Sequence, residues 1–304
     1  MKRQIMRQIS IAFGLGALLF VTGCPPFQKK ATPDFRAPVT STTPTAGELV
    51  AAMNDNARKI QSVGCRYLDI DCAQGEKSVG LRGWMYCQKP KSFRMSASLA
   101  GNTEVDMGSN DSEFWYWIRR SEPPYLFHCS HEEFAKGQVR LQVPFQPEWI
   151  MEALGMAEYD PTKSYQVVAN KNTIELIEPA VLPQGQQVNK ITVFTRSQNG
   201  LQVTGHVLKD SQNNVICTAT IVRTQQDTGT GVLLPKVVQL NWEAEHLKMQ
   251  LHMPGLSVNG MEGQRNPDLY ARPNMKDIQS YDLARGVSLG APGGVRRLSS
   301  EPLR

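Results

Sequence analysis

The chain has 304 residues, of which 40% are hydrophobic and 20% are charged, and its formal net charge is +5 at pH 7. Three of the basic residues, Lys2, Arg3 and Arg7, lie within the first 23 residues, and without that stretch the net charge falls to +2. So weak a positive charge gives no reason to expect a nucleic-acid partner.

The N-terminus has the pattern of a cleaved targeting segment. After the basic start, residues 9–23 form the apolar run "ISIAFGLGALLFVTG", which is shorter than the roughly 20 apolar residues needed to span a bilayer. The run ends in "VTGC", a small residue before a cysteine, which resembles the lipobox of bacterial lipoproteins. That resemblance implies a signal peptide over residues 1–23, cut before Cys24. An ordinary secretory signal with an incidental cysteine is the alternative.

The lipobox resemblance also implies a place for the protein. Acyl chains such as palmitate on Cys24 would anchor it stably, because two chains bury enough methylene groups to hold a protein on a membrane. Pro25 follows the cysteine, where many inner-membrane lipoproteins have aspartate. We therefore expect a lipid-anchored protein of the cell envelope, on the outer membrane and facing the periplasm.

Five cysteines remain besides Cys24, and no pair has the Cys-x-x-Cys spacing of a redox dithiol or a zinc site. An odd number leaves at least one of them unpaired in an oxidising compartment. Residues 24–45 are rich in Pro and Thr and are typical of an extended tether. Residues 261–304 form a polar tail that we expect to be mostly disordered.

Residues 46–260 predict a single, mainly β domain. A helix opens it, because Leu49, Met53, Ala57 and Ile60 recur at helical spacing. About eleven strand-like runs follow, and a short apolar helix bounded by Pro147 and Gly155 interrupts them. So many antiparallel strands curl on themselves, and we expect one sheet rolled into an incomplete barrel with helices as lids.

Three stretches in this order resemble the periplasmic lipoprotein carriers and outer-membrane lipoprotein receptors of the LolA/LolB type. They are "LRGWMYCQKPKSFRM", "GSNDSEFWYWI" and "PFQPEWIMEALGM", and the later "VNKITVFTRSQNGLQVTGHVL" is similar to the family's C-terminal meander. The resemblance covers roughly residues 46–258. It implies an incomplete barrel that encloses a hydrophobic cavity for acyl chains under helical lids.

The resemblance also suggests which residues form the site. Lys89 stands where the carriers have an arginine that latches the lid, so Lys89 is the latch candidate. Phe114 to Trp117 place aromatic rings on both faces of one strand, so one pair would meet the cavity and the other a covering element. Our candidates for the cavity lining are Leu81, Trp84, Tyr86, Phe93, Met95, Phe114, Tyr116, Trp149, Ile150 and Leu154.

These features predict a binding protein rather than an enzyme. It would hold lipid or lipoprotein acyl chains, for transfer or sorting to the outer membrane, and would need no cofactor and no catalytic residue. The alternative is an envelope sensor or scaffold that uses the same fold to bind a carrier or another envelope protein.

One cluster could suggest a metal, because His128 and His131 lie close together in "HCSHEE". A strand that runs into a helix produces the same letters, with Ser130 as N-cap and Glu133 three residues later. We therefore expect no metal site.

Overall fold

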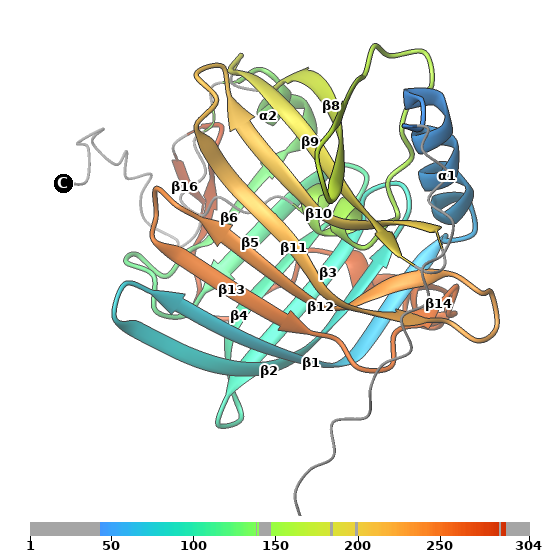
Figure 1. The fold of residues 1–304 in the computed structure, drawn as a ribbon. Helices are drawn as coiled ribbons and strands as arrows, with labels where there is room; N and C mark the ends of the chain where they lie inside the picture. The colour runs from blue at the N-terminus through green and yellow to red at the C-terminus, as the bar shows by residue number, and fades with distance from the viewer. Residues whose placement is uncertain are drawn as a thin grey trace, which may run out of the picture. The chain divides into compact units, whose positions relative to one another are not determined.

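Antiparallel pairing of consecutive strands builds most of this molecule (Figure 1). The computed structural model describes residues 43–137, 139, 147–182, 185–197, 200–285 and 287–289. Within these residues one sheet contains sixteen strands, in the order β16-β15-β6-β5-β4-β3-β2-β1-β13-β12-β11-β10-β9-β8-β7, with β14 paired to β1. The two ends of this order do not pair with each other in the described chain, so the sheet is an incomplete barrel, as predicted.

Thirteen of the sixteen strands form two meanders. The first contains β1 (Ser62–Gln74), β2 (Lys77–Gln88), β3 (Ser92–Leu99), β4 (Asn102–Ser109), β5 (Glu113–Ile118) and β6 (Leu126–Ser130). The second contains β7 (Gln166–Ala169), β8 (Thr173–Val181), β9 (Gln187–Ser197), β10 (Gly200–Asp210), β11 (Val215–Gln226), β12 (Leu233–Trp242) and β13 (Leu247–His252). β13 pairs with β1, where Ile70 lies opposite Leu251, and this pairing joins the two meanders into one sheet.

Irregular pairing helps the sheet to curl. The register shifts between Cys65 and Leu68 on β1, between Val203 and Gly205 on β10, and twice between Ile221 and Thr224 on β11. An extra residue in one strand bends it and increases its twist. Both meanders therefore bend, and their apolar residues gather on the inner face of the curl.

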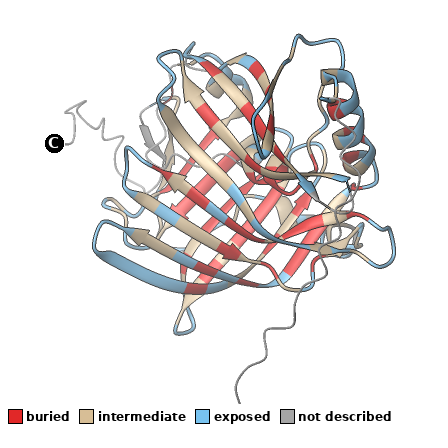
Figure 2. Ribbon diagram, in the orientation of Figure 1, coloured by how far each residue is buried: buried red, intermediate tan, exposed pale blue. Residues whose placement is uncertain are grey.

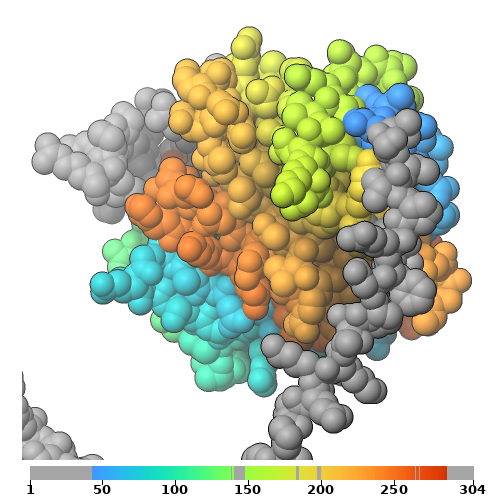
Figure 3. Space-filling view, viewed as in Figure 1, coloured from blue at the N-terminus to red at the C-terminus, as the bar shows by residue number. Residues whose placement is uncertain are grey.

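Helices lie on the inner side of the curled sheet. They are α1 (Ala46–Arg58), α2 (His131–Ala135) and α3 (Pro147–Ala153). α1 begins at Thr45, whose side chain accepts a hydrogen bond from the backbone of Glu48 while the Glu48 carboxylate bonds back. Its Leu49 and Val50 pack on Ile174 and on the neighbouring strand β9, so α1 is held on the second meander (Figures 2 and 3).

Described residues beyond 260 also belong to the fold, which corrects the expectation that residues 261–304 are mostly disordered. They form α4 (Glu262–Arg265), the 3-10 helix η1 (Pro267–Tyr270), β15 (Ser280–Asp282) and β16 (Val287–Leu289), after β14 (Ser257–Val258). We call residues 262–285 and 287–289 the C-terminal strap. β15 pairs in parallel with β6, and the backbone N–H of Leu126 donates to the carbonyl of Gln279.

The C-terminal strap explains the aromatic strand β5. Trp115 and Trp117 lie on the outer face, where they pack with Leu126 against Met275 and Ile278 of the strap. A covering element on one face of this strand was expected from the sequence but was not identified there as the C-terminal strap, which is the reason why rings occur on both faces.

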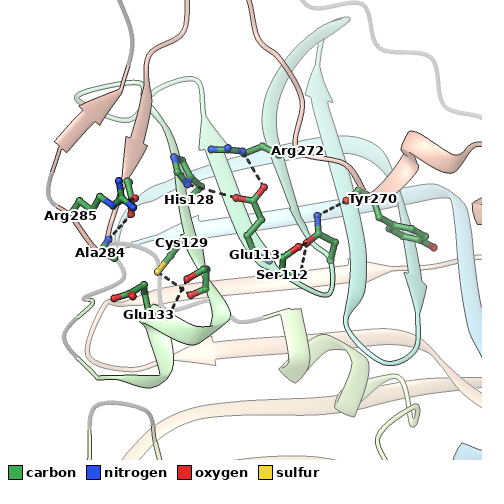
Figure 4. A network of polar contacts seen from close by, with 12 residues as sticks. Ser112, Glu113, His128, Cys129, Glu133, Tyr270, Arg272, Ala284 and Arg285 are labelled. Carbon is green, nitrogen blue, oxygen red and sulfur yellow. Dashed lines mark hydrogen bonds and ion pairs between the residues drawn. The ribbon is translucent and has the colours of Figure 1, made fainter. Parts of the chain in front are cut away.

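Contacts of polar side chains hold the strap on the same face (Figure 4). The Arg94 guanidinium donates to the Ala271 carbonyl at 2.8 Å, and its centre lies 5.5 Å from the centroid of the Trp115 ring. Arg272 forms an ion pair with Glu113 at 3.3 Å. The strap is thus tied to β3 and β5 as well as to β6.

No helix in the described ranges is both long enough and apolar enough to cross a membrane.

Candidate functional site

The inner face of the sheet carries the largest apolar cluster among the described residues. Met85, Met107, Leu240, Trp242 and Leu251 from four strands belong to it, and α3 contributes Met151. Six of the predicted lining residues lie in this cluster: Leu81, Phe93, Met95, Tyr116, Ile150 and Leu154. Phe114 packs in a neighbouring cluster with Cys129 and Val139.

Two predicted lining residues, Trp84 and Tyr86, lie on the other face. Side chains alternate along β2, so that Leu81, Met85 and Cys87 enter the inner cluster while Trp84 and Tyr86 point outward. The two outward rings contact each other, with 5.5 Å between their centroids. The prediction combined residues from opposite faces of one strand and is wrong for these two.

Three hollows open along the inner face, and we name each by its place. The end hollow, of about 400 Å³, is lined mainly by apolar side chains that include Ile70, Leu81, Met95, Met107, Trp242 and Met249. The lid hollow, of about 270 Å³, lies between the lid helices and β9 to β12, and its walls include Met53, Leu154, Tyr159, Phe194, Val203 and His206. The central hollow, of about 60 Å³, is lined by residues such as Trp149, Ile150, Ile191, His206, Leu240 and Trp242.

The hollows share walls. Trp242 lines both the end hollow and the central hollow, and the central and lid hollows share Glu152 and His206. The inner face therefore combines a packed apolar core with three adjoining hollows. The central hollow meets the end hollow at Trp242, and it meets the lid hollow at Glu152 and His206.

A row of polar side chains joins α3 to the sheet, and the sequence analysis missed it. Glu152 on α3 forms an ion pair with Lys190 of β9 at 2.8 Å and accepts a hydrogen bond from the Tyr159 hydroxyl at 2.9 Å. The Tyr159 hydroxyl also lies 3.2 Å from Thr192 Oγ1, and Thr192 Oγ1 lies 3.4 Å from His206 Nδ1. These residues have no common motif, and only the alternation that places Lys190 and Thr192 on one face of β9 could have indicated them.

The surroundings lower the pKa values of two groups in this row, Glu152 and His206. Burial opposes ionisation of Glu152, but the charges of Lys190 and His206 and hydrogen bonds from Lys190 and Tyr159 bring its pKa below the ordinary 4.5. Burial also lowers the pKa of His206 below 6.5, although the charge of Glu152 opposes that shift. At neutral pH Glu152 is therefore a carboxylate and His206 a neutral imidazole.

These shifts predict that acid weakens the fold. Both groups bind a proton less readily in the folded chain than in the unfolded chain, so the stability they contribute is lost as the pH falls below 6.5 for His206 and below 4.5 for Glu152. Urea unfolding across this range measures the effect. In Lys190→Met the loss below pH 4.5 should become smaller, whereas Lys209→Met, on the next strand, should follow the unmodified protein. An unchanged profile in Lys190→Met would contradict this assignment.

Lys89 contacts α1 and the segment that follows α3. Its Nζ donates to the carbonyl of Ala57, in the last turn of α1, at 2.9 Å, and forms an ion pair with Glu158, just after α3, at 3.0 Å. The side chain is 17% exposed. Through these contacts Lys89 joins α1 to the segment after α3. We propose that it acts as the latch of the lid.

The latch role makes a mutational prediction. Lys89→Met should lower the free energy of unfolding by about 1–3 kcal/mol, because it removes a charged donor from a largely buried carbonyl. It should also speed amide hydrogen exchange in α1. Lys91→Met, at an exposed position two residues away, is the matched control. Equal exchange rates in α1 of both variants would rule out the latch.

The histidines of "HCSHEE" have other partners. His131 Nε2 lies 2.8 Å from the carbonyl oxygen of Asn110, and His128 Nδ1 faces Glu113 at 3.8 Å (Figure 4). Ser130 accepts a hydrogen bond from the backbone N–H of Glu133 at the start of α2, as expected for the N-cap. In the part of the chain that the structure describes, no three His, Cys, Asp or Glu side chains are placed to hold a metal.

Cysteines in the described ranges form no disulfide: Cys65, Cys72, Cys87, Cys129 and Cys217 are free. Cys24, the predicted signal peptide and almost all of the predicted tether lie outside the described residues.

Comparisons place this architecture among known folds. The sequence matches no protein-family model and no curated protein. A DUF1329 family protein from Desulfovibrio piger aligns with a TM-score of 0.50 at 11% identity, over 74% of this chain and 97% of its own. A putative outer membrane lipoprotein-sorting protein domain from Vibrio parahaemolyticus aligns with a TM-score of 0.50 at 8% identity, over 75% of this chain and 100% of its own.

The chain has a LolA/LolB-like fold. A LolA superfamily protein from Nitrosomonas europaea also aligns, with a TM-score of 0.46 at 9% identity, over 73% of this chain and 97% of its own. The LolA/LolB-like fold was expected from three short stretches of sequence, and for the fold that expectation is confirmed. At such low identities the likeness concerns architecture alone.

Proposed function

We propose that this protein is a lipid-anchored envelope protein that binds acyl chains of lipids or lipoproteins in the hollows of its inner face. Its fold supports binding and sorting rather than catalysis, since it resembles a putative lipoprotein-sorting domain. Acylation of Cys24, attachment to the outer membrane and a periplasmic location complete the proposal.

The adjoining apolar hollows carry this proposal. A chain of sixteen carbons costs about 12 kcal/mol to expose to water, at about 0.8 kcal/mol for each methylene, so it needs a site that excludes water. Ligand pockets usually measure about 300–1,000 Å³, and the end hollow alone has about 400 Å³. The lid hollow adds a second space next to α1 and α3, the elements that would move to admit a chain.

Native mass spectrometry tests the proposal directly. The mature chain carrying Cys24→Ala, which has no acyl group of its own, should be released from cells with bound lipid and should take up a sixteen-carbon probe at one site. Transfer of that probe between vesicles would identify a carrier. Failure to bind any acyl probe, together with recovery of one stoichiometric protein partner, would favour the sensor or scaffold alternative.

A further inference from the structure

The hydrogen bonds in the polar row beside α3 can be donated in one direction only. The Glu152 carboxylate can only accept hydrogen bonds, and it accepts from Lys190 Nζ and from the Tyr159 hydroxyl. The single hydrogen of the Tyr159 hydroxyl is used in this bond. The 3.2 Å contact between Tyr159 and Thr192 must therefore use the hydrogen of the Thr192 hydroxyl.

The direction of these hydrogen bonds determines which ring nitrogen of His206 carries the hydrogen. With its own hydrogen given to Tyr159, the Thr192 oxygen can only accept in the 3.4 Å contact with His206 Nδ1. Nδ1 therefore carries the ring hydrogen, and a neutral imidazole then has a lone pair on Nε2. The row ends in a hydrogen-bond acceptor.

The acceptor lies where a ligand would be. His206 lines both the central hollow and the lid hollow, beside apolar neighbours such as Ile150, Leu208 and Phe194. Among the residues that the structure describes, no hydrogen bond to Nε2 is found. A ligand that displaces water from this hollow must replace the hydrogen bond that Nε2 could make to water, so a ligand donor is favoured there.

We propose that His206 Nε2 accepts a hydrogen bond from the polar end of the bound lipid, and that this end is an uncharged donor, either a hydroxyl or an amide N–H. Glu152 and Lys190 already balance each other at 2.8 Å, so a ligand carboxylate would add an unbalanced charge. An ester offers only acceptors and would face the His206 lone pair. The inference rests on the proposed binding of acyl chains and states which acyl lipids are preferred.

Competition binding tests the preference. Four probes with the same sixteen-carbon chain displace a fluorescent acyl probe from the mature Cys24→Ala protein: hexadecanol, palmitamide, methyl palmitate and palmitate. The two donors should bind about 5- to 10-fold more tightly than methyl palmitate, the effect of about one hydrogen bond. A preference for hexadecanol alone assigns a hydroxyl as the natural group, and a preference for palmitamide alone assigns an amide.

Variants separate this inference from the proposed function. His206→Phe keeps a ring of similar size and should lose the preference for hexadecanol and palmitamide over methyl palmitate, while palmitate is still disfavoured by its charge beside Glu152 and Lys190. His252→Phe, on β13 beside Asp69, is the matched control and should keep the preference. Equal affinities in the unmodified protein would overturn the role of His206 and leave acyl binding in place, whereas no binding of any probe would overturn both.

The ring itself offers a readout that does not depend on the variants. The ¹⁵N chemical shifts of His206 should show a protonated Nδ1 and an unprotonated Nε2 in the ligand-free protein. A hydrogen on Nε2 would overturn the proposal.

Discussion

Replacing Trp242 by alanine is expected to lower the free energy of unfolding by about 3–5 kcal/mol, the usual cost of removing a buried aromatic ring. Trp242 is 3% exposed and belongs to the inner apolar cluster. Because Trp242 lines both the end hollow and the central hollow, removing its ring should enlarge the joint space, and the variant should also accept longer acyl chains. Urea unfolding measures the first effect, and native mass spectrometry with probes of increasing chain length measures the second.

Trp84 provides the control. It is a tryptophan of the same sheet, but it lies half-buried on the outer face beside Tyr86. Trp84→Ala should cost less stability and leave the preferred chain length unchanged. If Trp84→Ala altered the chain length and Trp242→Ala did not, the assignment of the inner face as the binding wall would be wrong.

Arg94 supports the second large prediction. Its guanidinium lies 2.8 Å from Asp106, and the two side chains are 10% and 11% exposed. Burial raises the pKa of the Asp106 carboxyl, and the charge of Arg94 and its hydrogen bond oppose that rise. Arg94→Met would leave a buried carboxyl without its partner, so the expected loss is about 3–5 kcal/mol in urea unfolding.

A second substitution isolates the cause of this loss. Arg94→Met combined with Asp106→Leu removes both charges, and most of the lost stability should return. The bond from Arg94 to the Ala271 carbonyl stays absent in both variants, so the difference between them reports the unpaired carboxyl. A double variant as unstable as the single one would show that anchoring of the C-terminal strap, rather than charge pairing, is the main contribution of Arg94.

Local sequence patterns were sufficient for most of the first meander and for two helices. The alternating runs that became β1 to β6 are bounded by turn residues, and the helix between Pro147 and Gly155 ends where Gly155 adopts a positive φ of 75°. Such signals act over a few residues, and they can be read without knowledge of the distant parts of the chain.

Features that depend on distant contacts could not be predicted in this way. Alternation shows that Trp84 and Leu81 lie on opposite faces of β2, but it does not show which face is the inner one when both are covered. The cover on the outer face comes from residues near the C-terminus, whose polar composition suggested disorder. The row from Glu152 to His206 likewise combines an α3 residue with side chains of β9 and β10, and only the folded chain brings them together.

The parallel pairing of β15 with β6 has a consequence for the order of folding. Strands β1 to β13 are all synthesised before the segment that covers Trp115 and Trp117, so these rings stay exposed until the C-terminal strap has been made. A protein that has lost the residues from Met275 onward would keep these two rings in solvent. Exposed apolar surface of this kind favours aggregation, so pairing of the strap with β6 protects the outer face of β5.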